Sequence, residues 1–178
     1  MIQVHKAWAG LALILYAATS VAGQTALGIM PYDEHADAQA EVAAARALAR
    51  ERGQLLMVLF GANWCPDCRA FDAALRDSSV TQLVDDNFVI AKVDVGNWDH
   101  NTDVVEAWGD PISGGIPAIV VTTATGDVVY TSKPGDLSRA RYMDQVALEV
   151  FFARVLALGQ ATPQSVVAPS QADMESVQ

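Results

Sequence analysis

Two cysteines three residues apart, in the segment Cys65-Pro66-Asp67-Cys68, are the side chains best suited to chemistry in this chain. A short apolar run precedes them, and proline in the first turn of a helix predicts that Cys65 opens one. The unpaired N–H groups and the dipole of a helix start favour a thiolate, lowering a thiol pKa from about 8.5 into roughly the 3.5–7.5 range. Because the thiolate is the reactive form in disulfide exchange, we predict Cys65 as an exposed nucleophile and Cys68 as the more buried resolving thiol.

The cysteine pair could also serve two other purposes. A static disulfide between neighbouring helical turns would close too small a loop to stabilise the fold much. A metal site would need further ligands, and only His35 and His100 follow the N-terminal segment, neither at metal-ligand spacing from the cysteines. We therefore expect no bound metal and no cofactor beyond a redox-active disulfide, Cys65–Cys68. A copper chaperone using both thiolates with His100 stays open as an alternative.

A second element, Gly114-Gly115-Ile116-Pro117, comes directly before an apolar segment that is expected to be a strand. Proline is tolerated at a strand start, and an Ile-Pro bond adopts the cis form far more easily than a bond without proline. A cis bond would turn the N–H and C=O of Ile116 outward, where they could pair with an extended substrate peptide. On sequence chemistry alone trans is favoured, since cis accounts for only about 5–6% of such bonds in folded proteins.

Hydrophobic periodicity predicts the elements that position the two motifs. Helix and strand patterns alternate along the chain, which indicates a single α/β layer fold. The continuous apolar run before the cysteines predicts a strand that is buried on both faces. The expected helices cover residues 35–52, 66–77, about 79–86 and 142–158, and the expected strands cover residues 54–60, 88–95, 116–123 and 128–131.

Composition places these elements in one acidic domain with an apolar core. The chain has 178 residues, of which 52% are hydrophobic, and a formal net charge of −10. That length suits one domain, and the apolar content is too high for disorder throughout. Because phosphate binding needs clustered Lys and Arg, nucleic acid is not expected as a partner.

Both ends of the chain are predicted to lie outside the domain. Residues 1–23 carry Lys6, then an apolar run of about 12 residues and then small residues, which is the layout of a secretory signal peptide. The run is shorter than the roughly 20 residues of a membrane-spanning helix. We therefore expect a periplasmic or secreted protein, with a domain over residues 24–158 that is monomeric and free of the membrane after signal cleavage. Residues 159–178 are expected to be a disordered tail.

Together, the motifs resemble the thioredoxin family over about residues 37–158. The segment from Phe60 to Cys68, with Trp64 directly before the first cysteine, resembles that family's strand, Trp-Cys-x-x-Cys motif and helix. Residues 91–95 resemble its next central strand, and Gly115-Ile116-Pro117 resembles its cis-proline loop. Residues 126–129 and 133–135 resemble its final hairpin and the glycine that follows.

The resemblance implies a thioredoxin-like fold with a central mixed β-sheet flanked by helices. It also implies a thiol–disulfide oxidoreductase that acts on protein thiols and disulfides and works with a redox partner still to be identified. By position, Cys65 attacks, Cys68 resolves, and Trp64, Ile116 and a cis Pro117 bind substrate beside the sulfurs. A reductase is favoured because the chain carries no large inserted domain. The alternative is a non-enzymatic module that holds a client in the groove beside the cis proline or on the connection over residues 96–115.

The chain departs from the family pattern beside the motif. Leu59 occupies the strand position of the family's buried acid, which helps to deprotonate the resolving thiol, so this step is expected to use water, Lys92 or another group. The connection over residues 96–115 is longer and more polar than in a compact thioredoxin, and it carries Trp98, His100 and Trp108. We interpret it as a partly packed surface loop in preference to a lid or docking surface.

Overall fold

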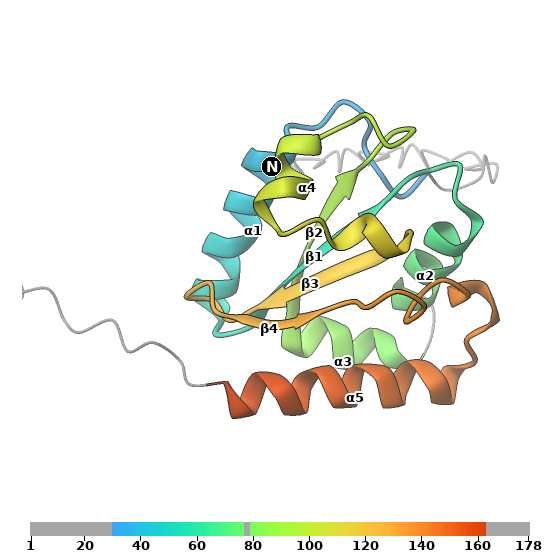
Figure 1. Ribbon diagram of the computed structural model, residues 1–178. Helices are drawn as coiled ribbons and strands as arrows, with labels where there is room; N and C mark the ends of the chain where they lie inside the picture. Colours follow the sequence, from blue (N-terminus) through green and yellow to red (C-terminus); the bar gives the residue numbers. More distant parts are fainter. Residues whose placement is uncertain (1–29, 77–78, 163–178) are drawn as a thin grey trace, which may run out of the picture.

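A four-stranded mixed sheet forms the centre of the protein in the computed structural model, which describes residues 30–76 and 79–162 (Figure 1). The strand order is β2-β1-β3-β4, with β1 parallel to β2 and antiparallel to β3, and β3 antiparallel to β4. The strands are β1 (Leu55–Gly61), β2 (Phe88–Asp94), β3 (Ala118–Thr122) and β4 (Val128–Thr131). The predicted α/β fold with a mixed sheet is confirmed.

Helices cover both faces of the sheet (Figure 1). The first helix packs on β1 and β2, while α3 contacts β2 and α5 contacts β4 on the opposite side. The α-helices are α1 (Ala38–Arg52), α2 (Pro66–Arg76), α3 (Val80–Asn87), α4 (Thr102–Ala107) and α5 (Gln145–Ala161), and the 3-10 turns are η1 (Pro111–Gly114) and η2 (Ala140–Tyr142).

The strand before the cysteines is buried along almost its whole length. Every residue of β1 from Leu56 to Gly61 is buried, as its continuous apolar sequence predicts for a strand with neighbours on both edges and helices on both faces. Phe152 of α5 packs on Phe71 of α2 and Phe88 of β2. The start of α2, where the motif lies, is therefore fixed to a rigid strand and a packed aromatic cluster.

The last helix begins and ends later than expected. The side chain of Asp144 accepts a hydrogen bond from the N–H of Ala147 and so caps α5, which starts at Gln145 and continues to Ala161. The prediction of a disordered tail is therefore wrong for residues 159–161, which are part of this helix. A methyl group on Gly159 would lie 2.9 Å from a Leu55 side-chain carbon, so glycine lets the helix pack closely on β1 and does not end it.

The remaining predictions about the chain ends lie outside the described residues. They concern the signal peptide over residues 1–23 and the tail from residue 163 onward. Within the described ranges, no helix has the length and apolar content to cross a membrane.

Candidate active site

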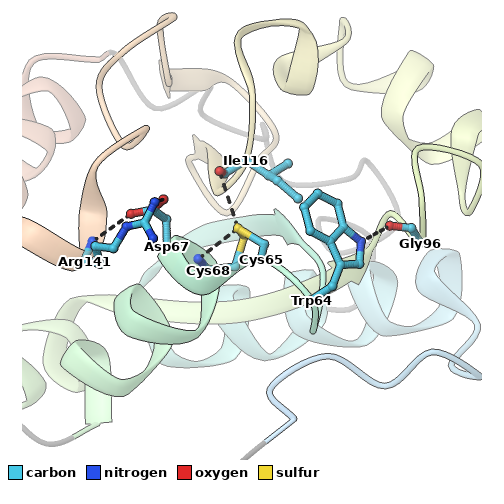
Figure 2. Close-up of a disulfide and its surroundings, with 7 residues drawn as sticks. All are labelled: Trp64, Cys65, Asp67, Cys68, Gly96, Ile116 and Arg141. Atoms are coloured by element: carbon cyan, nitrogen blue, oxygen red, sulfur yellow. Dashed lines mark hydrogen bonds and ion pairs between the residues drawn. A yellow bond between two sulfur atoms is a disulfide. The ribbon is translucent and has the colours of Figure 1, made fainter.

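The two cysteines form a disulfide at the N-terminus of α2, directly after β1 and a short connection (Figure 2). Their Cα atoms lie 5.2 Å apart. The backbone N–H of Cys68 donates a hydrogen bond to the sulfur of Cys65, with a distance of 3.1 Å. When the disulfide is reduced, the same N–H and the helix dipole both point at the Cys65 sulfur, an arrangement that stabilises a thiolate there.

The two sulfurs differ in their access to solvent less than the sequence suggested. Cys65 is 4% exposed and Cys68 is completely buried. The prediction of an exposed nucleophile is therefore wrong in degree, because the carbonyl oxygen of Ile116 lies 3.6 Å from the Cys65 sulfur and covers it. Cys65 remains the one residue of the pair with any exposed surface.

The loop over Gly115-Ile116-Pro117 lies against the disulfide, as the resemblance implied (Figure 2). The Ile116–Pro117 peptide bond is cis. Ile116 is 9% exposed, and its carbonyl group faces the sulfur of Cys65. The structure thus brings the cysteines together with Ile116 and Pro117, which lie about fifty positions later in the sequence.

Trp64 stands on one side of the disulfide with half of its surface exposed (Figure 2). Its indole N–H donates to the carbonyl of Gly96 at 2.8 Å, which fixes the ring against the long connection. Trp98 of that connection lies 6.1 Å from Trp64, centroid to centroid, and is also half exposed. Trp108, in contrast, is partly buried against the core, so the connection combines the packed loop we expected with an exposed aromatic pair beside the sulfurs.

Asp67, between the cysteines, is tied to a distant segment on the other side of the disulfide (Figure 2). Its carboxylate accepts a hydrogen bond from the backbone N–H of Arg141 at 3.0 Å and forms a salt bridge with the Arg141 guanidinium at 3.1 Å. The carboxylate is 9% exposed. Arg141 therefore balances the charge that the sequence placed next to the thiolate, and it holds η2 against α2.

A buried carboxylate that the sequence reading missed lies one turn beyond Cys68. Asp72 occupies the same buried face of α2 as Cys68, four residues on, and its side chain is 2% exposed. It forms salt bridges with Lys92 on β2 and with Arg76, the latter at 2.7 Å. Lys92 lies beside Leu59 in the sheet register, next to the strand position of the family's buried acid, and its partner is an acid on the helix.

A second buried cluster packs the N-terminal segment beneath the motif. The side chain of Asn63 accepts from the N–H of Tyr32 at 3.1 Å and donates to its carbonyl at 2.8 Å. The Tyr32 ring is buried over Gly61, and its hydroxyl has no hydrogen-bond partner among the described residues. Burial, with a further contribution from the carboxylates of Asp72 and Asp94, raises the pKa of Tyr32 well above its ordinary value.

His100 lies near the site without touching the sulfurs. Its Nδ1 is 3.3 Å from a carboxylate oxygen of the buried Asp94, and about half of its side chain is exposed. Together with Trp64 and Asp99, these two residues line a pocket of about 280 Å³. In residues 30–76 and 79–162, no group of three or more His, Cys, Asp or Glu side chains is arranged to hold a metal ion.

A disulfide-forming Cys-x-x-Cys pair at a helix start on a mixed α/β sheet defines the protein as a thiol–disulfide oxidoreductase of the thioredoxin type. The thioredoxin-like family model matches residues 37–124. A disulphide isomerase from Xylella fastidiosa Temecula1 has a similar structure, with 45% identity, a TM-score of 0.69, and a match over 72% of this chain and 98% of that one. The chain belongs to the thioredoxin-like family.

A thioredoxin from Thermus thermophilus also has a similar structure. Its sequence is 25% identical, the TM-score is 0.50, and the match covers 67% of this chain and 86% of that one. No curated protein matches the chain.

Proposed function

We propose that this protein is an exported reductase of protein disulfides, with Cys65 as the attacking sulfur and Cys68 as the resolving one. The observation that carries the proposal is the 3.1 Å hydrogen bond from the Cys68 N–H to the Cys65 sulfur at the start of α2. It favours negative charge on the sulfur of Cys65, the one residue of the pair with any exposed surface, while Cys68 is completely buried.

The reaction proceeds by two exchanges. The Cys65 thiolate attacks one sulfur of a substrate disulfide, forms a mixed disulfide, and releases the other substrate sulfur as a thiolate, which takes up a proton. The Cys68 thiol loses its proton and its sulfur attacks Cys65, which releases the second substrate thiolate and forms the Cys65–Cys68 disulfide. Two electrons pass from the protein to the substrate, and a dithiol donor must return them.

Asp72, which is ion-paired with Lys92, is suited to take the proton that Cys68 loses. Asp72 shares the buried face of α2 with Cys68, and Lys92 holds its carboxylate in place from β2. Lys92 is the proton-transfer candidate from the sequence, and the ion pair gives it a partner that lies one helical turn from the resolving thiol. Asp72 is the acceptor in this scheme, and Lys92 is a positioning residue.

Substrate binding is assigned to the surface around the Cys65 sulfur. The backbone of Ile116, held beside the sulfur, would pair with an extended peptide, with Pro117 fixing the loop. Trp64 and Trp98 offer an apolar surface to the substrate on the adjoining side. The similar protein from Xylella is described as a disulphide isomerase, an activity that begins with the same attack on a protein disulfide.

An insulin-reduction assay with dithiothreitol as electron donor tests the proposal. Cys65→Ser should lower the rate to that of dithiothreitol alone, whereas Cys68→Ser, the matched substitution three positions on, should accumulate a covalent complex with the substrate. Equal rates for wild type and Cys65→Ser would contradict an enzyme and favour the client-holding module. A spectroscopic titration of the reduced protein with Cu(I) tests the metal-chaperone alternative, which requires binding that disappears in Cys65→Ser.

Two further measurements address direction and location. The reduction potential of the Cys65–Cys68 couple should lie near the low values of reducing thioredoxins, and a strongly oxidising value would contradict the reductase assignment. Expression of the full chain, followed by cell fractionation and N-terminal sequencing of the mature protein, should show export with loss of about the first 23 residues. Recovery of the intact chain in the cytoplasm would contradict export.

A further inference from the structure

The outward face of α5 is apolar along its length. Val146 is 66% exposed and Val150 is 63% exposed, and Arg154 is the one charged residue among the exposed positions of this helix. The helix lies along an outer edge of the molecule with α3 on its inner side (Figure 1). In a chain with a net charge of −10, such a face is unusual for a surface that meets only water.

The exposed apolar residues follow the spacing of a helix-pairing seam. Val146, Val150, Ala153 and Ala157 are exposed and are separated by four, three and four positions, which is the alternation of the d and a positions of a heptad. A separate stripe, made of Leu148, Phe152 and Val155, packs inward on the core. Helix α5 therefore has two apolar faces, of which residues 30–76 and 79–162 cover one.

Charged residues on either side of the seam indicate what covers the second face. Glu149 and Arg154 flank it at positions g and e of the same heptads, five residues apart. Two parallel helices in register bring g of one against e of the other, so Glu149 of each protomer meets Arg154 of its partner. Antiparallel helices would instead bring like charges together. Neither residue forms a salt bridge with another described residue. Glu149 accepts hydrogen bonds from Ser79 and Gln145, and Arg154 lies close enough to the Asp136 carboxylate to help lower its pKa.

We infer that the protein forms a homodimer through α5, with the two helices parallel and related by a two-fold axis. This replaces the monomer expected from the sequence and does not depend on the proposed reductase activity. The seam is short and half of it is alanine, so the interface belongs at the small, weak end of specific interfaces. We expect a dissociation constant in the micromolar range.

Sedimentation velocity of the full chain, from about 5 to about 500 µM, tests the dimer. Val150→Glu should raise the dissociation constant at least about tenfold, because the two-fold axis places two carboxylates face to face. Val128→Glu is the matched control, since Val128 is 60% exposed but lies on β4, away from the seam. It should leave the dissociation constant unchanged, and both variants should keep the disulfide-reduction rate of the wild type.

A cross-linking experiment tests the parallel register. In a background with Cys65→Ser and Cys68→Ser, Val150→Cys should give a disulfide-linked dimer when diamide oxidises the two facing thiols, because each seam residue meets its own copy. Val128→Cys should remain monomeric under the same treatment. In addition, Arg154→Glu should weaken the dimer, and Glu149→Arg in the same chain should restore it.

Several results would overturn the inference. They are a wild-type protein that stays monomeric at all concentrations, a dimer that Val150→Glu leaves intact, and equal cross-linking at positions 128 and 150. A monomer that co-sediments with anionic lipid vesicles, and loses this with Val150→Glu, would show that the face binds a membrane surface and not a second copy.

Discussion

Replacing Gly61 by alanine should destabilise the protein through a single contact at the end of β1. A Cβ atom at this position would lie 2.2 Å from the Tyr32 hydroxyl oxygen and 2.4 Å from the ring carbon that carries it. The ring cannot slide away easily, because both backbone groups of Tyr32 are bonded to Asn63. We therefore expect Tyr32 to leave its site together with the segment that precedes α1.

The magnitude follows from what that displacement costs. Exposing a buried aromatic ring costs about 3–5 kcal/mol, as large-to-small substitutions show. Releasing the unpaired Tyr32 hydroxyl from the interior offsets about 1–2 kcal/mol of this. The net loss for Gly61→Ala is then about 3 kcal/mol, a shift of about 1.5 M in the urea midpoint if the m-value is near 2 kcal/mol/M. Without a clash, replacing glycine by alanine in a strand would stabilise the protein by about 0.5–1 kcal/mol. The sign of the change in unfolding free energy therefore already distinguishes the two cases.

A double-mutant cycle with urea unfolding checks this reasoning. Tyr32→Leu removes both clashing atoms, so adding Gly61→Ala to it should cost almost nothing, with a coupling of at least about 2 kcal/mol. Tyr32→Phe keeps the ring carbon at 2.4 Å and should not rescue Gly61→Ala. Two results would contradict this reasoning. Gly61→Ala could unfold at the same urea concentration as the wild type, or Tyr32→Phe and Tyr32→Leu could restore its stability equally. In either case, the clash with the Tyr32 ring does not set the stability cost of a side chain at position 61.

Three other substitutions probe the site and its surroundings. Asp72→Asn should slow the attack of Cys68 on the mixed disulfide between Cys65 and the substrate at least about tenfold, and should flatten the pH dependence of this step, because the carboxylate that takes the Cys68 proton is lost. Rapid-quench kinetics measures the step, and an unchanged rate would contradict the role of Asp72. Burial raises the pKa of Asp136, but the hydrogen bonds from Tyr130 and the Lys133 N–H and the nearby cations lower it by more, so the net pKa lies below its ordinary range. A depressed folded-state pKa gives stability above the unfolded pKa, near 4, that is lost as pH falls through the folded value. Tyr130→Phe should therefore cost about 1 kcal/mol in urea unfolding at pH 7 and progressively less below pH 4; an equal cost at both would contradict the coupling. Trp98→Ala should raise the KM for a protein substrate several-fold and leave the rate with a small aromatic disulfide unchanged; equal effects on both would remove Trp98 from substrate binding.

The elements around the disulfide were predictable because their signals are local. An unbroken apolar run gives β1, and a proline in the first turn gives the start of α2. The hairpin strand expected over residues 128–131 coincides with β4. The end of α5 was missed because the sequence from Gly159 onward lacks helical periodicity, whereas Gly159 packs closely on Leu55 and the helix continues to Ala161.

The acid of the site was missed for a different physical reason. Aspartate is a residue type that usually lies at the surface. The burial of Asp72 is tolerated because Lys92, on another element, forms an ion pair with it. A signal was nevertheless present, since Cys68, Phe71, Asp72 and Leu75 share one face of the helix and the aspartate interrupts an otherwise apolar stripe. An acid at such a position indicates a buried partner of opposite charge.

Other buried polar side chains around the cysteines are also paired with residues that are distant in the sequence. Three buried polar side chains lie on α2 or just before it, and each binds a residue that is 20 or more positions away in the sequence. These pairs are Asn63 with Tyr32, Asp67 with Arg141 and Asp72 with Lys92, separated by 31, 74 and 20 positions. The spacing of the cysteines predicts that a disulfide can form, but the orientation of the helix that carries it depends on these long-range pairs. Breaking any one of them should therefore alter the reduction potential before it unfolds the domain, because the sulfurs lie at the point where the three attachments meet.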